Sequence, residues 1–497
     1  MKKNPTNLKN RREFMKQSGL AAMGLMTLPS LLSSFRFAAS PDVPHFGPAA
    51  NYTPKIKAAF IRREENYGMW WPGEIYDGEA ACKMYTEKIK DAEIKLGIQV
   101  DITSKPIYSL EEGERWIQEA KDARADGLLL VTLDRQQHTW PTVGKALDNN
   151  IPTVIFSPLG SSFTTNTQLY CKKDGAFIAS TDDFSQAEFG MKMLKAGAKI
   201  RETRYLVIID GITEISEISL DHFGTKLRFI PADHFIDLYH DMRDSREAKE
   251  LALTYIQSAD HIHDATAEDV INGARSYFAV THLLEREQAD AVTMDCLGVL
   301  GPLEISLPCL AWSKLNDSGI PAACEGDLEA CLTHCVVQYL FDKPAFQQDP
   351  VAETAKGCLI GSHCSCPTRL AGLDTEPEPY SILNHHGKRD ATLNPEWKLG
   401  QTVTVADLIL PVAQNSLRKP RVDYTEGKPK MLISTGEVVE QKSIPPAGGC
   451  VVAPMVKLHG VESYLDYPGF HQMFFYGDHK HELKHFSQLF GITPEVI

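Results

Sequence analysis

The sequence lacks an excess of positive charge. Its 51 lysines and arginines are outnumbered by 65 aspartates and glutamates, which gives a formal net charge of -14 at neutral pH. An acidic chain repels phosphate backbones and anionic lipid headgroups. Nucleic acid and membrane surfaces are therefore not expected as partners, and a neutral small molecule is favoured.

The sequence also lacks the short motifs of several large enzyme classes. It contains no G-x-x-x-x-G-K-S/T loop, no G-x-G-x-x-G fingerprint and no G-x-S-x-G elbow. Nucleotide-binding and esterase functions therefore have no support from motifs. What the chain does have is length. Its 497 residues, 43% of them hydrophobic, exceed what one hydrophobic core accommodates, and this length predicts about three globular domains.

The first 40 residues have the order of a secretory signal. A basic start is followed by a modest apolar run from Gly19 to Leu32 and by small residues up to Ser40. The segment from Asn10 to Lys16 resembles the twin-arginine consensus, and the apolar run is too short to span a bilayer comfortably. We expect cleavage near Ser40, export to the periplasm by the twin-arginine machinery, and no membrane insertion afterwards. A basic N-terminal arm is the alternative interpretation.

The cysteines do not form the pattern of a disulfide framework. There are 11 of them, an odd number, and most lie between Cys296 and Cys366. A secreted disulfide framework is short and has an even number of cysteines, so buried free thiols are the favoured interpretation. The spacings around Cys331 and Cys364 lack the second pair that a thiolate zinc site requires.

Strands and helices alternate after a polar linker at 41–54. Apolar runs that fit strands lie at 56–61, 97–102, 127–133, 152–156, 204–211 and 290–294. Helical patterns separate these runs, and strands that alternate with helices predict parallel sheets. We therefore expect two doubly wound, Rossmann-like α/β domains, at 55–165 and 166–348.

The pattern changes after residue 348, where turn residues multiply. Short β-type runs follow at 401–410, 430–434 and 450–456. A last helical pattern begins near Lys480 and ends at Gly491, a residue that suits a helix C-terminus. We expect a mainly β, barrel-like C-terminal domain with a closing helix at 349–497.

Three segments carry ionisable side chains in apolar surroundings. Glu304 interrupts a helix-like apolar stretch, Glu325 and Asp327 follow a strand-like run at 322–324, and His471 lies among aromatic residues. A buried carboxylate must be paired, hydrogen-bonded or bound to a metal, and α/β sheets bind ligands at the carboxyl ends of their strands. Each residue also has a structural interpretation: a satisfied core glutamate, a helix N-cap aspartate at 327, and a core histidine.

The order and spacing of these residues resemble the L-fucose isomerase family and, more loosely, L-arabinose isomerase. The resemblance covers residues 290–497 and depends on the Glu304-to-Asp327 separation, the Glu325-Gly326-Asp327 segment, and His471 ahead of a closing helix. It implies that Glu304, Asp327 and His471 bind one divalent cation, Mn2+ in that family, with Mg2+ or Co2+ as alternatives. It also implies that Glu304 and Asp327 act as catalytic base and acid, that Glu325 lies just outside the ligands, and that the protein is a trimer or hexamer.

The function that follows from the resemblance is aldose–ketose isomerisation of a small sugar in the periplasm. A cation bound to both substrate oxygens stabilises an enediolate while a carboxylate moves a proton between two carbons. Two other functions are retained. A non-catalytic periplasmic sugar-binding protein is one, because the strand-like runs at 127–133 and 151–156 resemble the first domain of such proteins. A metal-dependent lyase or epimerase on the same fold is the other.

Three further residues are candidate contacts for a sugar. His363 lies in a Gly-Ser-His-Cys-Ser-Cys segment, His385 in an Asn-His-His-Gly segment, and Trp71 in a Trp-Trp-Pro segment whose rings suit the apolar face of a sugar. Each residue also fits a structural role: a turn at 363, a solvated loop at 385, and aromatic packing at 71.

Overall fold

The computed structural model describes residues 45–65, 77–135, 137–385, 389–411, 427–442 and 450–497. The expected signal segment at 1–40 lies outside the described residues, and so does Trp71. None of the helices within the described ranges is long and apolar enough to cross a membrane.

The first α/β unit contains a five-stranded parallel sheet. Its strand order is β2 (Gln99–Ile102), β1 (Lys55–Ile61), β3 (Gly127–Thr132), β4 (Thr153–Ser157) and β5 (Ala176–Ser180). Its helices are α3 (Gly78–Leu96), α4 (Leu110–Asp122), α5 (Thr139–Leu147), α6 (Thr164–Thr167) and α7 (Ser185–Glu202). Every residue of β3 is buried, as an uninterrupted apolar run predicts. The expected parallel arrangement is confirmed, and β5 is a strand that the sequence pattern did not reveal.

The second α/β unit has a sheet that is parallel except at one edge. The strand order is β11 (Ala322–Ala323), β10 (Ala291–Met294), β6 (Arg204–Ile209), β8 (Lys226–Pro231) and β7 (Ser216–Ser219), with β7 antiparallel to β8. Its helices are α8 (Asp233–Asp241), α9 (Arg246–Ser258), α10 (Ala267–Glu287), α11 (Cys296–Leu300), α12 (Cys309–Asp317) and α13 (Leu328–Phe341), with a 3-10 turn at Met242–Asp244. The chain that leaves the carboxyl end of β11 carries Glu325 and Asp327 directly into α13.

The C-terminal part is a closed β-barrel, which confirms the barrel-like expectation. Its strands follow one another in the order β16 (Thr402–Ile409), β19 (Gln472–Tyr476), β12 (Phe346–Glu353), β13 (Cys358–Ser362), β18 (Pro454–Leu458) and β17 (Lys430–Gln441). Pairing of β16 with β17 closes the ring, and β20 (Thr493–Val496) adds to β17 from outside. A separate small sheet joins β9 (His261–His263), β14 (Tyr380–His385) and β15 (Asp390–Pro395).

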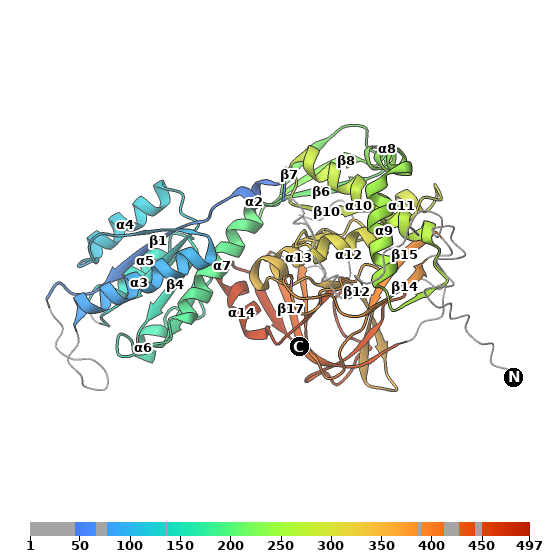
Figure 1. Cartoon of the computed structure of the whole chain (residues 1–497). Helices are drawn as coiled ribbons and strands as arrows, with labels where there is room; N and C mark the ends of the chain where they lie inside the picture. Colours follow the sequence, from blue (N-terminus) through green and yellow to red (C-terminus); the bar gives the residue numbers. More distant parts are fainter. Residues whose placement is uncertain (1–44, 66–76, 136, 386–388, 412–426, 443–449) are drawn as a thin grey trace, which may run out of the picture.

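Two helices tie these parts together. Helix α13 is buried on nearly all sides, because it packs against α7, the second sheet and barrel strand β16. Helix α14 (Lys480–Leu489) contacts both β17 of the barrel and β5 of the first sheet. At that contact the backbone amide of Gly175 donates to the carbonyl of Gln488 over 3.0 Å. Figure 1 shows the first unit at the left, and the second unit together with the barrel at the right, with α2 (Pro48–Asn51) between them.

Candidate functional site

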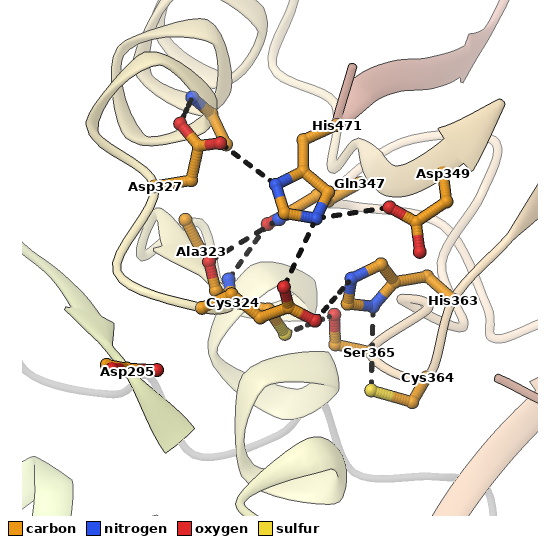
Figure 2. Close-up of polar contacts among 12 residues, drawn as sticks. Asp295, Ala323, Cys324, Asp327, Gln347, Asp349, His363, Cys364, Ser365 and His471 are labelled. Atoms are coloured by element: carbon orange, nitrogen blue, oxygen red, sulfur yellow. Dashed lines mark hydrogen bonds and ion pairs between the residues drawn. The ribbon is translucent and has the colours of Figure 1, made fainter. Parts of the chain in front are cut away.

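A cluster of histidines and carboxylates lies where the second α/β unit meets the barrel. Glu325 and Asp327 come from the loop between β11 and α13, and Asp349 comes from β12. His363 directly follows β13, and His471 directly precedes β19. Figure 2 shows the labelled side chains converging from these separate segments. We call Glu325, Asp327, Asp349, His363 and His471 the carboxylate–histidine centre.

Asp327 has two roles at once. Its Oδ1 atom caps α13 by accepting the backbone amides of Glu329 and Ala330 over 2.9 and 3.0 Å. Its Oδ2 atom accepts the Nδ1–H of His471 over 2.9 Å. The structural interpretation of Asp327 as a helix N-cap is therefore correct, and the same buried carboxylate also holds His471 in place.

The other nitrogen of His471 faces carboxylates. Nε2 lies 3.2 Å from Asp349 Oδ1 and 3.6 Å from Glu325 Oε2. Burial acts to lower the pKa of His471, but the hydrogen bonds and negative charges of Asp327 and Asp349 outweigh burial and raise this pKa to about 10. Without a cation, the ring is therefore an imidazolium at neutral pH.

His363 stands beside His471, with 5.5 Å between the ring centroids. A two-residue backbone bridge to Val452 fixes its position, since each amide donates to the other's carbonyl. Its Nε2 lies 3.8 Å from Glu325 Oε1, while Nδ1 faces the Cys364 thiol at 3.5 Å. Burial acts to lower the pKa of His363, but the neighbouring Cys324 outweighs burial and leaves this pKa raised.

Two residues of the carboxylate–histidine centre have a positive φ, a backbone conformation that residues other than glycine rarely adopt. Glu325 has φ 60° and His471 has φ 55°. Each lies next to or near a glycine that also has positive φ, Gly326 and Gly469. Strained backbone of this kind costs about 1 to 3 kcal/mol per residue and is concentrated at functional sites. Two strained donors that face one another mark this cluster as more than packing.

The donor set fits a divalent cation. The ligand atoms of Glu325, His363 and His471 all lie within 4.8 Å of one another. Nε2 of His363 is buried and forms no hydrogen bond within the described part of the chain, while Nε2 of His471 and Oδ1 of Asp349 are buried and form an ion pair with each other over 3.2 Å. Buried polar atoms without a hydrogen bond are rare in folded proteins, and a bound ion is one of their recognised explanations. Imidazole and carboxylate together suit divalent first-row metals.

Glu304 does not belong to this centre, which corrects the expected ligand set. Helix α11 ends at Leu300, and the amide of Ile305 returns to the Leu300 carbonyl over 3.2 Å. The resulting turn leaves Leu303 and Glu304 exposed, with Glu304 at φ 57°. Glu304 lines a separate cavity of about 220 Å³ together with Arg275. The expected helix through this position therefore stops too early to bury the carboxylate.

The structure gives the other candidate residues positions that differ from their expected roles as metal ligands or sugar contacts. Glu325, expected just outside the ligands, faces the Nε2 atoms of both histidines, whereas Asp327 lies on the Nδ1 side of His471. His363, expected as a sugar contact, is part of the centre. The backbone of His385 ends β14, and its side chain lies outside the described part, as does Trp71.

Sequence reasoning missed Asp349 as a donor. The register of the barrel explains its position: Asp349 on β12 pairs with Ser362 on β13, the residue just before His363. The local sequence around Asp349 and Pro350 is compatible with a strand, but it does not indicate which other strand pairs with it. The pairing is visible only once the barrel is closed.

A larger cavity lies elsewhere, in contact with α7, α9, α10, α12 and α13. It has a volume of about 950 Å³ and contains none of the residues of the centre. Four tyrosines line it, together with charged groups: Tyr255, Tyr277, Tyr339, Tyr380, Lys195, Lys199, Lys314 and Arg369. Burial lowers the pKa of Lys195 and of Lys314. Aromatic faces with polar groups suit a polyhydroxylated ligand.

No family model matches this sequence, and no curated protein matches it. Solved structures that match include GanP, a glucose-galactose binding protein, and AraP, an arabinose binding protein, both from Geobacillus stearothermophilus. Each is 13% identical with a TM-score of 0.18; the matches cover 58% of this chain and 90% and 89% of those chains. A periplasmic solute binding protein from Actinobacillus succinogenes with bound D-allose is 11% identical with a TM-score of 0.19, covering 58% of this chain and 92% of that chain. TM-scores this low carry no argument about function.

The resemblance to L-fucose and L-arabinose isomerases is corrected by these findings. No model of an isomerase family matches this sequence. The motif spacing also depended on Glu304, which lies outside the centre. Isomerase activity and a manganese requirement therefore lose their support. The trimer or hexamer was implied by the same resemblance and stays an untested prediction.

Proposed function

We propose that this chain is an exported sugar-binding protein whose carboxylate–histidine centre holds one divalent metal ion. The observation that carries the proposal is the convergence of three buried donor atoms, His363 Nε2, His471 Nε2 and Asp349 Oδ1, around Glu325. A cation here satisfies all three atoms and takes the place of the proton on His471. Neighbouring hydroxyls of a sugar then offer oxygen ligands on its open side.

The open side of the centre is formed by the carboxylates. The side chains of Glu325 and Asp349 are 31% and 30% exposed, whereas His363 and His471 are 1% and 2% exposed. A cation held here is therefore anchored by buried imidazoles and faces solvent beside Glu325 and Asp349. Burial raises the pKa of Glu325, so its negative charge depends on a nearby positive partner. This arrangement supports ligand access from one direction.

Export completes the proposal. The order of basic start, twin-arginine-like segment and apolar run supports transport to the periplasm, where free sugars are captured. The twin-arginine route carries folded proteins. A metal bound before export is therefore selected by the supply of ions in the cytoplasm and not by affinity alone.

The test compares metal-free protein with protein given Mg2+, Mn2+, Co2+ or Zn2+, using calorimetry for metal and then for a panel of aldoses and ketoses. We expect one ion per chain with Mg2+ or Mn2+, and sugar binding that requires the ion. Glu325→Gln should weaken metal binding at least about tenfold, and the matched control Glu304→Gln should leave it unchanged. A wild-type chain that binds no divalent ion would refute the centre as a metal site.

The same experiment locates the sugar and asks whether it reacts. Sugar binding that persists without metal and in Glu325→Gln would assign the sugar to the 950 Å³ cavity beside Tyr255 and Tyr380. Chromatography of each incubated sugar tests for a product, which a purely binding protein does not form. Interconversion of epimers or cleavage of the sugar would instead support the metal-dependent epimerase or lyase function.

A further inference from the structure

A second donor set lies against the centre on its buried side. The thiols of Cys324 and Cys364 and one nitrogen of His363 lie within 4.8 Å of one another, and all three residues are buried. Cys324 follows β11 of the second α/β unit and Cys364 lies just after β13 of the barrel, so the contact between these two parts brings together two cysteines that are 40 positions apart in sequence. Figure 2 shows the Cys364 sulfur beside the His363 ring, on the side of the ring away from His471.

The spacing matches the edge of a metal tetrahedron. Cys364 Sγ lies 3.5 Å from His363 Nδ1. With metal–sulfur bonds of about 2.3 Å and metal–nitrogen bonds of about 2.0 to 2.1 Å, a tetrahedral ion separates sulfur and nitrogen by about 3.6 Å. The Cys324 thiol also contacts the Ser365 hydroxyl at 3.1 Å, so an oxygen already stands beside the sulfur pair. Little movement is needed for these atoms to surround a cation.

The geometry points to a second metal site, formed by Cys324, Cys364 and Nδ1 of His363, that takes a thiophilic cation such as Zn2+ or Cu+. Thiolate ligands select these ions over Mg2+ and Mn2+, which prefer oxygen. Packing of free thiols in the core is the structural alternative, and Cys296 in the same apolar cluster fits it, whereas the Cys309 thiol contacts Cys364. The cluster around Cys324 and Cys364 differs because an imidazole and a hydroxyl face the sulfurs.

The two donor sets are linked through His363. A neutral imidazole offers one lone pair, on Nδ1 or on Nε2, while the other nitrogen carries the proton. When Nδ1 binds a cation at the thiols, Nε2–H faces Glu325; when Nε2 binds at the centre, Nδ1–H faces the Cys364 sulfur. A thiophilic ion therefore withdraws His363 from the centre and weakens the metal held there.

The test uses the full chain, made metal-free, and titrates it with Co2+ as a probe. Thiolate ligation gives a sulfur-to-cobalt charge-transfer band in the near ultraviolet, which we expect to saturate at one ion per chain. Cys324→Ser and Cys364→Ser should abolish the band and weaken Zn2+ binding at least about 100-fold. Cys82→Ser, in α3 of the first unit, should leave both unchanged.

Two further measurements keep the inference independent of the proposed function and of variant folding. The double variant Glu325→Gln with Asp349→Asn removes donors of the centre and should retain the charge-transfer band. X-ray absorption of zinc-loaded wild-type protein should show two sulfur neighbours at about 2.3 Å. A zinc ion surrounded only by nitrogen and oxygen, or no charge-transfer band in well-folded wild-type protein, would overturn the thiolate site.

Discussion

His471 Nδ1 and Asp327 Oδ2 meet at 2.9 Å although 144 positions separate the two residues in sequence. The contact joins His471, which directly precedes strand β19 of the barrel, to Asp327, the N-cap residue of α13. It fixes which nitrogen of His471 carries a proton, so that Nε2 is the atom presented to Glu325 and Asp349. A carboxylate behind a metal-binding histidine has this orienting role in many metal sites.

Replacing Asp327 by Asn separates its two roles. An asparagine side chain still caps α13 with its oxygen, but it no longer supplies a negatively charged acceptor for His471. Asp327→Asn should lower metal affinity about 10- to 100-fold while it keeps the cap of α13. Asp327→Ala should lose the cap as well, at a further cost of about 1 kcal/mol. Calorimetry and thermal melts measure the two effects, and equal melting points for both variants would contradict the cap.

The stability of the metal-free protein should fall at alkaline pH. The pKa of His471 is about 10 in the folded chain and about 6.5 when unfolded. A raised pKa stabilises the fold fully below pH 6.5, and this stabilisation is lost as pH rises towards 10, by up to about 1.4 kcal/mol per pH unit. Urea unfolding at pH 6, 8 and 10 measures the slope. Asp327→Asn should flatten it, and an unchanged slope in that variant would assign the effect to other groups.

Glu325→Gly should stabilise the fold while it removes metal binding. Glycine adopts positive φ without the cost of about 1 to 2 kcal/mol that other residues incur. Part of this gain is offset by the greater freedom of glycine when unfolded, so we expect a net gain of about 0.5 to 1 kcal/mol. Glu329→Gly, in the first turn of α13, is the comparison variant and should destabilise, because it removes the buried carboxylate that accepts the Leu410 amide. A loss of stability in Glu325→Gly would argue against backbone strain at this residue.

The junction between α7 and the C-terminal end of α14 has no room for a larger residue. A Cβ atom on Gly197 would lie 2.1 Å from the ring of Phe490. Gly197→Ala should therefore cost about 1 to 3 kcal/mol by overpacking. The double variant Gly197→Ala with Phe490→Leu should recover most of this loss, because the smaller side chain makes room. Thermal unfolding of the two single variants and the double variant gives the coupling, and strictly additive losses would contradict direct contact.

Local sequence patterns were sufficient to predict those elements whose structure depends mainly on neighbouring residues in the sequence. The apolar run at 127–133 predicted β3, and Asp327 before Leu328 predicted a helix start, because strand burial and capping depend on neighbours in sequence. Glu304 shows the limit of such patterns. Its apolar neighbours suggested a helix, but the chain turns after Leu300 and leaves the carboxylate in solvent.

The full set of donor residues could not be predicted from the spacing of residues in the sequence. Asp349 and His363 reach the centre through the pairing of β12 with β13, and a shift of one residue would turn Asp349 to the other face. Barrel register is determined by many weak contacts across the whole sheet, so it cannot be read from any one segment.

Strand β19 lies between β12 and β16, so the ring is complete only when β19, which His471 directly precedes, is in place. In a chain whose barrel is still open, Glu325 and Asp327 are in position on the loop before α13, but the imidazole of His471 is not yet beside them. Under the proposed function, retention of the metal ion therefore distinguishes fully folded molecules from those in which β19 is missing from the barrel. Under the same proposal, we expect a bound ion on copies in which β19 is in place and none on copies in which β19 is misplaced.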